Sequence, residues 1–356
     1  MRHAVIMAGG AGVRLWPLSR RNRPKQVLRL LGGESLLRQS YDRVIGLFEP
    51  EQIHIITNEA HLPFVAEVIP EIPESNLYGE PVGRDTANAV GLAAAVLHER
   101  DPQAVIGVFT ADHVISPQDR FHDAVQRAFS TVEQHPDALV TFGVRPTRPD
   151  TNYGYVHRGG RLDEGVYEVE EFIEKPNFAS AARYVSEGEY YWNSGMFCWK
   201  ATTILDQLKK HLPQSHASLT EIAAAWQGGE REAKLRSIYP KLLRISIDFA
   251  VMERADHVLV VELKCQWVDV GSWPALESVL QSDGDGNVAA CSHVVHLGSR
   301  GNIVVSEEPH LIATIGVDDL VIVHSPTATL ICTRRDAQGI KELVDNIRQR
   351  FGEEFT

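Results

Sequence analysis

Residues 3–14 read HAVIMAGGAGVR, a short apolar run that passes directly into a glycine-rich loop. The run His3–Met7 has the length and the β-branched content of a strand buried on both faces of a sheet. Glycines let backbone N–H groups approach phosphate oxygens, and α/β sheets bind ligands beyond the carboxyl ends of their strands. This stretch therefore predicts an α/β fold whose first loop binds phosphate.

The segments that follow continue the alternation of strand and helix. Short apolar strands are expected at Ile53–Thr57, Ala104–Thr110 and Ala138–Gly143, and Asp85–Arg100 has the pattern of a helix rich in small residues. Such an alternation predicts a Rossmann-like, doubly wound, mostly parallel mixed sheet.

The C-terminal part of the chain has a different pattern. From Asn287 to Thr333 it is β-rich with frequent turn signals, and a closing helix is expected at Asp336–Arg350. The run DGDGN at Asp283–Asn287 is the best boundary. We therefore expect a catalytic domain at residues 1–284 and a small β-rich domain at residues 285–356.

Composition excludes several classes of function. The formal net charge of the 356 residues is −12, which argues against nonspecific binding to nucleic acid or to anionic membranes. No apolar run approaches the ~20 residues that a membrane span needs. The four cysteines are scattered and show no metal-binding spacing, so we expect free thiols in a reducing cytoplasm.

The charge is unevenly spread along the chain. The first 33 residues contain seven arginines and lysines and no acid, since the first acidic residue is Glu34. On charge alone two interpretations stay open, a local anion site and a solvated arginine-rich loop.

The glycine loop matches neither of two better-known phosphate loops. A P-loop needs the tripeptide Gly-Lys-Ser or Gly-Lys-Thr, which the chain lacks. The dinucleotide fingerprint needs a third glycine where Leu15 stands, and Pro17 and Pro24 interrupt the helix that it should open. Arg14 and Lys25 add positive charge that can hold phosphate oxygens. The loop is therefore predicted to be a phosphate site of another kind.

The loop resembles the opening of the sugar-phosphate nucleotidyltransferases. Residues 9–20 read GGAGVRLWPLSR and residues 24–26 read PKQ, and the RLWPLSR form is similar to the mannose-1-phosphate guanylyltransferase branch. Further blocks follow in the family's order: GRDTA at 83–87, TADH at 110–113, NYGYV at 152–156, FIEKP at 172–176, WNSGMF at 192–197, SIDFAVME at 246–253 and WVDVGSW at 267–273. The resemblance covers the chain from the first strand to the final helix. It implies the fold of nucleotide-diphospho-sugar transferases with a short β-helix-like tail, which we expect to contribute to a homodimer contact.

The resemblance also implies a reaction and a set of site residues. GTP and mannose 1-phosphate would give GDP-mannose and diphosphate, with Mg²⁺ as cofactor and with Arg14 and Lys25 as the catalytic cations. The implied nucleotide contacts are Ala8, Gly9, Gly10, Gly12, Arg14, Lys25, Arg84, Asp85, Thr86 and Asp112.

Two aspartates are implied as metal ligands, Asp112 and Asp269. Each follows a predicted strand, and two carboxylates with phosphate oxygens and water suit Mg²⁺. Without the resemblance, a helix cap is the more common role for such a residue. His113 is expected to be structural, because imidazole is a poor ligand for Mg²⁺.

The implied sugar-phosphate pocket consists of Gly154, Glu174, Lys175 and Asn193. Glu174 would accept sugar hydroxyls and Lys175 would hold the phosphate, although a solvated ion pair is the alternative for these two residues. Asn193 offers both a donor and an acceptor. Asp248 is treated as structural.

One block departs from the family pattern, which has Asn where this chain has Asp85 and Pro where it has Asn88. The block is expected near the base and ribose, where the Asp85 carboxylate could accept from guanine N1–H and its amino group. The open alternatives are a different nucleotide or sugar 1-phosphate, such as UTP, dTTP or glucose 1-phosphate, and a catalytically silent relative. A dinucleotide-dependent oxidoreductase is excluded by the missing third glycine.

Overall fold

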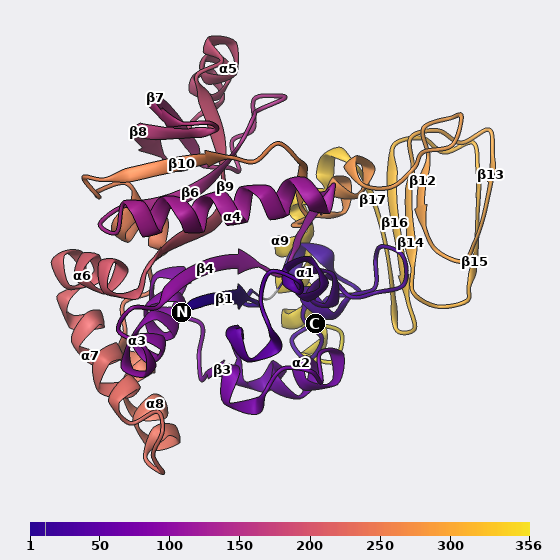
Figure 1. The fold of residues 1–356 in the computed structure, drawn as a ribbon. Helices are drawn as coiled ribbons and strands as arrows, with labels where there is room; N and C mark the ends of the chain where they lie inside the picture. Colours follow the sequence, from indigo (N-terminus) through magenta and orange to yellow (C-terminus); the bar gives the residue numbers. More distant parts are fainter. Residues whose placement is uncertain (11) are drawn as a thin grey trace.

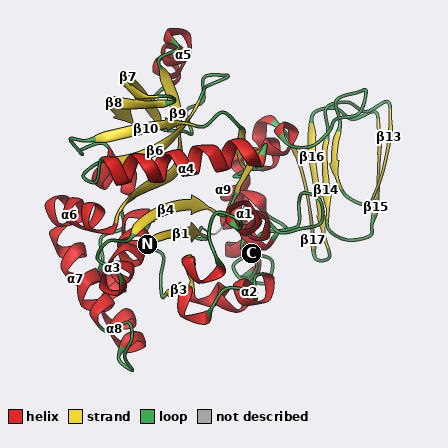
Figure 2. Cartoon of the chain, viewed as in Figure 1, coloured by secondary structure: helices red, strands yellow, loops and turns green. Residues whose placement is uncertain are grey.

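The computed structural model describes residues 1–10 and 12–356, and a mixed nine-stranded sheet lies at the centre of that part of the chain (Figure 1, Figure 2). Its strands are β1 (Arg2–Met7), β2 (Ile53–Asn58), β3 (Leu77–Glu80), β4 (Val105–Thr110), β6 (Leu139–Val144), β7 (Tyr155–Asp163), β8 (Val166–Ile173), β9 (Tyr190–Lys200) and β10 (Val258–Glu262). Their order across the sheet is β3-β2-β1-β4-β9-β6-β10-β8-β7. β9 is antiparallel to β4 and β6, and β8 is antiparallel to β10 and β7, so the other seven strands share one direction. The predicted mostly parallel mixed sheet is confirmed.

Helices cover both faces of this sheet, each over its own apolar core (Figure 1). One core includes side chains of α1 (Leu36–Val44), α2 (Leu62–Val68), α4 (Gln118–Gln134) and α5 (Phe178–Glu187). The other includes side chains of α3 (Thr86–Arg100), α6 (Ala201–His211), α7 (Pro213–Ala224) and α8 (Arg231–Ile238). A doubly wound sheet has helices and an apolar core on each of its faces. The predicted doubly wound fold is therefore confirmed.

Local sequence explains how the helices on the two faces pack. In α4 the buried side chains Phe121, Val125, Phe129 and Val132 recur every three or four residues, which makes one apolar stripe. In α3 small residues allow close approach, since a Cβ on Gly91 would lie 2.7 Å from Leu219 of α7. The small-residue pattern noted in the sequence therefore fixes the distance between two helices.

A short antiparallel ladder and a β-rich module complete the fold. The ladder consists of β5 (His113–Ser116) and β11 (Gln266–Asp269). The module contains β12 (Val288–Ala290), β13 (His293–Leu297), β14 (Ile303–Ser306), β15 (Leu311–Ile315), β16 (Leu320–Ser325), β17 (Ala328–Thr333) and the closing helix α9 (Ile340–Phe351). Its strands pair as β12-β14-β16-β17 and as β13-β15, with β17 alone antiparallel, and they stand to one side of the main sheet (Figure 1). The expected β-helix-like tail is confirmed.

A third apolar core joins the phosphate-loop region to the C-terminal module. Leu15, Leu18 and Leu28 are buried in one cluster with Val305 of β14 and Val323 of β16. The two ends of the chain thus share a core. The domain division at residues 284 and 285 therefore stays a prediction. In the part of the chain that the structure describes, no helix is long and apolar enough to cross a membrane.

Candidate active site

The glycine loop after β1 folds tightly against Lys25. Gly10 and Gly12 have φ angles of 101° and 59°, in the region that favours glycine. A Cβ on Gly12 would lie 2.7 Å from the Cβ of Lys25 and 2.8 Å from Ser19 Oγ, so no other residue fits there. Gln26 closes the loop by donating from Nε2 to the Gly9 carbonyl at 2.5 Å. The predicted residues Ala8, Gly9, Gly10 and Gly12 thus form one cradle, and Ala11 lies outside the described residues.

The β5–β11 ladder brings the two predicted metal ligands together. His113 pairs with Asp269 in the ladder register, and the Val270 amide donates to the Asp112 carbonyl at 3.0 Å. The Lys25 ammonium forms an ion pair with Asp112 Oδ2. Asp269 Oδ1 is buried and lacks a hydrogen-bond partner among the described residues. The site therefore combines one cation with two carboxylates, of which one has an unused oxygen.

The two carboxylates differ in their electrostatic surroundings. Burial opposes ionisation of Asp112, but the Lys25 ammonium beside it holds the pKa of that carboxyl below its ordinary value. Burial and the neighbouring charge of Asp112 raise the pKa of Asp269. Asp112 is thus the charged partner of Lys25, and Asp269 is the carboxylate that needs a further positive charge.

His113 supports this pair from behind. Trp267 donates its indole N–H to His113 Nδ1 at 3.1 Å, so Nδ1 is an acceptor and the ring proton of the neutral form lies on Nε2. That nitrogen lies 3.9 Å from Asp112 Oδ1. Ligand atoms of Asp112, His113 and Asp269 all lie within 4.8 Å of one another, which fits a divalent cation. Because Nε2 carries the proton, the two carboxylates are the better ligands, and the structural role of His113 stays a prediction.

The predicted sugar-pocket residues also lie together. A Cβ on Gly154 would clash with Glu174 Oε2. The backbone N–H of Asn193 donates to the Gly154 carbonyl at 2.8 Å. Lys175 contacts Glu174 with its Nζ at 2.6 Å. The glycine therefore leaves room for the carboxylate of Glu174, and the four residues form one group.

Asp248 has a more specific place than the sequence indicated. It is the first residue of a π-helix, Asp248–Met252, and its Oδ1 accepts from Asn193 Nδ2 at 2.9 Å. Thr141 donates its hydroxyl to Asn193 Oδ1 at 2.9 Å, which fixes the orientation of the amide. Burial and the nearby Glu174 raise the pKa of Asp248 to about 7. Asp248 thus positions a predicted sugar-binding residue.

Aromatic rings connect the sugar group with the carboxylate pair. The ring of Tyr153 lies 5.2 Å from that of Trp192 and 5.0 Å from that of Trp267, both nearly edge-to-face. Trp192 precedes Asn193 in β9, and Trp267 holds His113. Packed aromatic rings therefore connect the two predicted half-sites.

The block at residues 84–86 lies at the start of α3 and is occupied by structural bonds. Asp85 caps the helix by accepting from the Thr86 amide at 2.9 Å and lies 3.9 Å from Arg244. Arg84 donates to the Pro240 carbonyl, and the Thr86 hydroxyl accepts from the Ile247 amide at 2.8 Å. Their role in nucleotide binding stays a prediction.

Sequence reasoning missed one acidic residue of this region, Glu80. It ends β3 and is 6% exposed. β3 has only four residues, so its apolar pattern is too short to mark a strand. The available signal was an acid directly before the block PVGRDTA, where a chain leaves a sheet at its ligand-binding edge.

The basic N-terminal residues divide between two tasks. Arg14 points toward the carboxylates, since its Nη2 lies 3.5 Å from the position of a Cβ on Gly271 and Asp269 lies 3.4 Å from the same point. Arg21 and Arg23 instead form ion pairs with Glu353 and Glu307 of the C-terminal module, at 2.6 and 2.5 Å. Two arginines of the basic segment thus contact the C-terminal module, and the local anion site stays a prediction.

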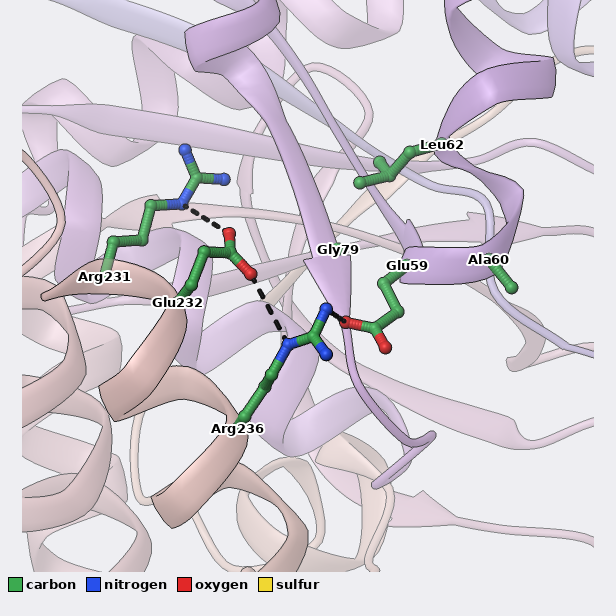
Figure 3. A pocket seen from close by; sticks show the side chains of 7 residues that line it. All are labelled: Glu59, Ala60, Leu62, Gly79, Arg231, Glu232 and Arg236. Atoms are coloured by element: carbon green, nitrogen blue, oxygen red, sulfur yellow. Dashed lines mark ion pairs between the residues drawn. The ribbon is translucent and has the colours of Figure 1, made fainter. Parts of the chain in front are cut away.

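A separate cavity beside β3 is lined by none of the predicted site residues (Figure 3). Its lining consists of Glu59, Ala60, Leu62, Gly79, Arg231, Glu232 and Arg236. Its charged side chains already face one another: Arg236 lies 3.3 Å from Glu59 and 3.7 Å from Glu232, and Arg231 lies 3.9 Å from Glu232. Because these charged side chains are already paired with one another, the cavity offers less charge to a ligand than the glycine loop and the β5–β11 ladder do. We therefore take the loop and the ladder as the candidate active site.

The family model described as Nucleotidyl transferase matches residues 3–285. The chain belongs to this nucleotidyl transferase family. A second family model, described as MannoseP isomerase/GMP-like beta-helix domain, matches residues 292–347.

Relatives match nearly the whole chain. A mannose-1-phosphate guanylyltransferase of Escherichia coli is 41% identical over 361 residues, covering 99% of this chain and 75% of the relative. The same figures hold for a mannose-1-phosphate guanylyltransferase of Klebsiella pneumoniae. A crystal structure from Thermus thermophilus, described as a mannose-1-phosphate geranyltransferase, is 34% identical with a TM-score of 0.89 and covers 98% of this chain and 99% of its own. The prediction of a nucleotidyltransferase of the mannose-1-phosphate guanylyltransferase group is confirmed.

Proposed function

We propose that this site makes GDP-mannose and diphosphate from GTP and mannose 1-phosphate. The observation that carries the proposal is the meeting of Lys25, Asp112 and Asp269 beside the glycine loop. A loop with open backbone, one buried cation and two carboxylates suits a triphosphate and its metal ion. The names of the relatives supply the base and the sugar.

The proposed reaction forms one P–O bond and breaks another. A phosphate oxygen of mannose 1-phosphate attacks the α-phosphorus of GTP in line, and diphosphate leaves with the bonding electrons. The glycine loop, Arg14 and Lys25 hold the triphosphate and offset the negative charge that develops. Gly154, Glu174, Lys175 and Asn193 hold the sugar phosphate. No general base is needed, because a phosphate monoester with a second pKa near ~6 is mostly dianionic at pH 7.

We assign Mg²⁺ to Asp112 and Asp269. The buried oxygen of Asp269 that lacks a partner among the described residues, and the pair of hard oxygen donors, fit this ion. When bound, it supplies positive charge to the phosphate oxygens. Asp269 would bind the ion through its unpaired Oδ1, and the Lys25 ammonium keeps Asp112 ionised.

The experiment is diphosphate release from GTP and mannose 1-phosphate. Excess EDTA should abolish turnover, and Asp269→Asn should lose most of it while the melting temperature stays nearly unchanged. Asp206→Asn, at an exposed position of α6, is the matched control and should behave as wild type. Full activity in EDTA would remove the metal assignment, and a collapsed fold in Asp269→Asn would make that residue structural.

A homodimer and a cytoplasmic location are also proposed. The outward face of β13 and β15 exposes apolar side chains in register, with Leu297 opposite Ile315 at 64% and 73% exposure. A second copy of this chain would cover them. Light scattering should give twice the mass of the monomer, and Leu297→Glu should reduce it. A monomeric wild type would contradict the proposal.

A further inference from the structure

A buried carboxylate faces the first glycine of the phosphate loop. Glu80 ends β3, and its Oε1 accepts the Tyr239 hydroxyl at 2.6 Å. Its Oε2 lies 3.9 Å from the position of a Cβ on Gly9. Tyr239 is fully buried, whereas Gly9 is exposed. One oxygen is thus anchored in the protein and the other lies at the open side of the loop.

The two ends of the loop differ in chemistry. The Gly12 end contacts Lys25, and Arg14 and Asp269 meet at Gly271, so cations and the carboxylate pair gather there. At the Gly9 end, the nearest side-chain atom to the position of a Cβ is Glu80 Oε2, at 3.9 Å. On the proposed function, a nucleoside triphosphate that lies along the loop places its phosphates at the cationic end. Its base then lies at the end with Glu80.

We propose that Glu80 determines the specificity of this site for guanine by accepting its N1–H and its 2-amino group. Guanine is the base whose Watson–Crick edge offers two neighbouring N–H donors. Adenine, cytosine, uracil and thymine place an acceptor beside their donor. Above its raised pKa of about 7 the Glu80 carboxyl is mostly ionised. An ionised carboxylate only accepts, so it matches the first pattern and repels the others. Tyr239 fixes the carboxyl group so that little freedom is lost on binding.

Asp85 is the rival carboxylate, and its contacts argue against it. Its side chain accepts from the Thr86 amide as the N-cap of α3 and faces Arg244. A carboxylate that already caps a helix has less capacity for a base. The nucleobase contact that the sequence assigned to Asp85 is therefore assigned here to Glu80.

The test compares kcat/KM for GTP and for ITP, which lacks the 2-amino group. Wild type should prefer GTP by about ten- to a hundredfold, the effect of one hydrogen bond to a charged group. Glu80→Gln keeps an acceptor for Tyr239 but replaces one oxygen by a donor, so the preference should fall to about threefold or less. Asp85→Asn, which still caps the helix, should keep the wild-type ratio.

The outcomes separate this inference from the proposed function. Wild type that does not use GTP would overturn the function itself. Wild type that uses GTP and ITP equally, or Glu80→Gln with the wild-type ratio, would overturn only the role of Glu80. A ratio lost in Asp85→Asn instead would assign the base to Asp85. If Glu80→Gln fails to fold in a thermal melt, the ratio in Tyr239→Phe decides: losing the hydroxyl that holds the carboxyl group should lower the preference for GTP, and an unchanged ratio would overturn the role of Glu80.

Discussion

Lys25 and Arg29 are four residues apart in the basic segment but do different work. Lys25 pairs with Asp112, and the charges of Asp112 and Asp269 raise its pKa against the effect of burial. The Arg29 side chain is exposed, and the residue contacts Glu307 through its backbone amide at 2.8 Å. The position of a cation, more than its presence in the segment, decides whether it contributes to the reaction.

Lys25→Gln should therefore lower kcat by about a hundredfold, the usual cost of removing one charge-stabilising donor from an active site. Arg29→Gln should change kcat less than about twofold. Steady-state diphosphate release measures both, with a thermal melt to confirm folding. Greater damage from Arg29→Gln would show that the phosphate loop is placed wrongly.

Burial of the Glu80 carboxyl group should lower the free energy of unfolding of the protein at neutral and alkaline pH. Burial raises the pKa of its carboxyl from about 4.5 to about 7, so the folded protein retains a proton that the unfolded chain releases above pH ~4.5. The stability associated with this proton is complete below pH ~4.5 and is lost as the pH rises through about 7.

Glu80→Gln should thus be more stable than wild type at pH 8 by up to about 3 kcal/mol, and the difference should vanish near pH ~4.5. Urea unfolding at both pH values gives the two free energies of unfolding. Glu342→Gln on the exposed side of α9 is the control and should show no such difference. A Glu80→Gln variant less stable than wild type at pH 8 would contradict the sign.

The π-helix that begins at Asp248 orients Asn193, a residue of the predicted sugar pocket. Asp248 holds the Asn193 amide, whose orientation decides whether it offers a donor or an acceptor. Asp248→Leu should raise the KM for mannose 1-phosphate about tenfold, because Asn193 Nδ2 then loses its hydrogen-bond acceptor. The KM for GTP should stay within about twofold. A selective rise in the KM for GTP would mean that Asp248 serves the nucleotide instead.

The sequence predicts those elements whose burial is complete. β1, β2, β4 and β6 are continuous apolar runs, and the pattern places each within one or two residues of its observed bounds. β3 and β5 are not expected from the sequence, because four residues carry too little pattern and the side chains of β5 alternate in burial.

The sequence predicts single residues of the site, but it does not predict which of them come together in space. Local pattern places Asp112 at a strand end, but its approach to Asp269 depends on a ladder between residues about 150 positions apart. The resemblance supplies that pairing, and no local rule could. The sequence does not identify Glu80 as a site residue, because its partner Tyr239 and its neighbour Gly9 are both distant in sequence.

At the scale of the whole molecule, the C-terminal module supports the phosphate loop. Trp16 donates its indole N–H to the Phe355 carbonyl at 2.6 Å, and Trp273 donates to the Trp16 carbonyl at 3.1 Å. Leu15, Leu18 and Leu28 are buried in the shared core. Removing the module would expose these side chains to water.

A fragment of residues 1–284 should therefore melt below the full chain and lose turnover, although it contains every predicted site residue. Three buried leucines alone represent about 5–9 kcal/mol of burial at 1.5–3 kcal/mol each. Thermal melts and diphosphate release on both chains measure the effect. A fragment with the melting temperature and kcat of the full chain would show that the first domain is autonomous.

Guanylyl transfer to mannose 1-phosphate can be measured by competition among nucleotides and sugar phosphates in one reaction. Equal concentrations of GTP, UTP, dTTP and ATP are supplied with mannose 1-phosphate and glucose 1-phosphate, and mass spectrometry identifies the nucleotide sugars. GDP-mannose should exceed every other product at least tenfold, which corresponds to about 1.4 kcal/mol of discrimination. A mixture in which a uridine or thymidine sugar equals or exceeds GDP-mannose would contradict the account.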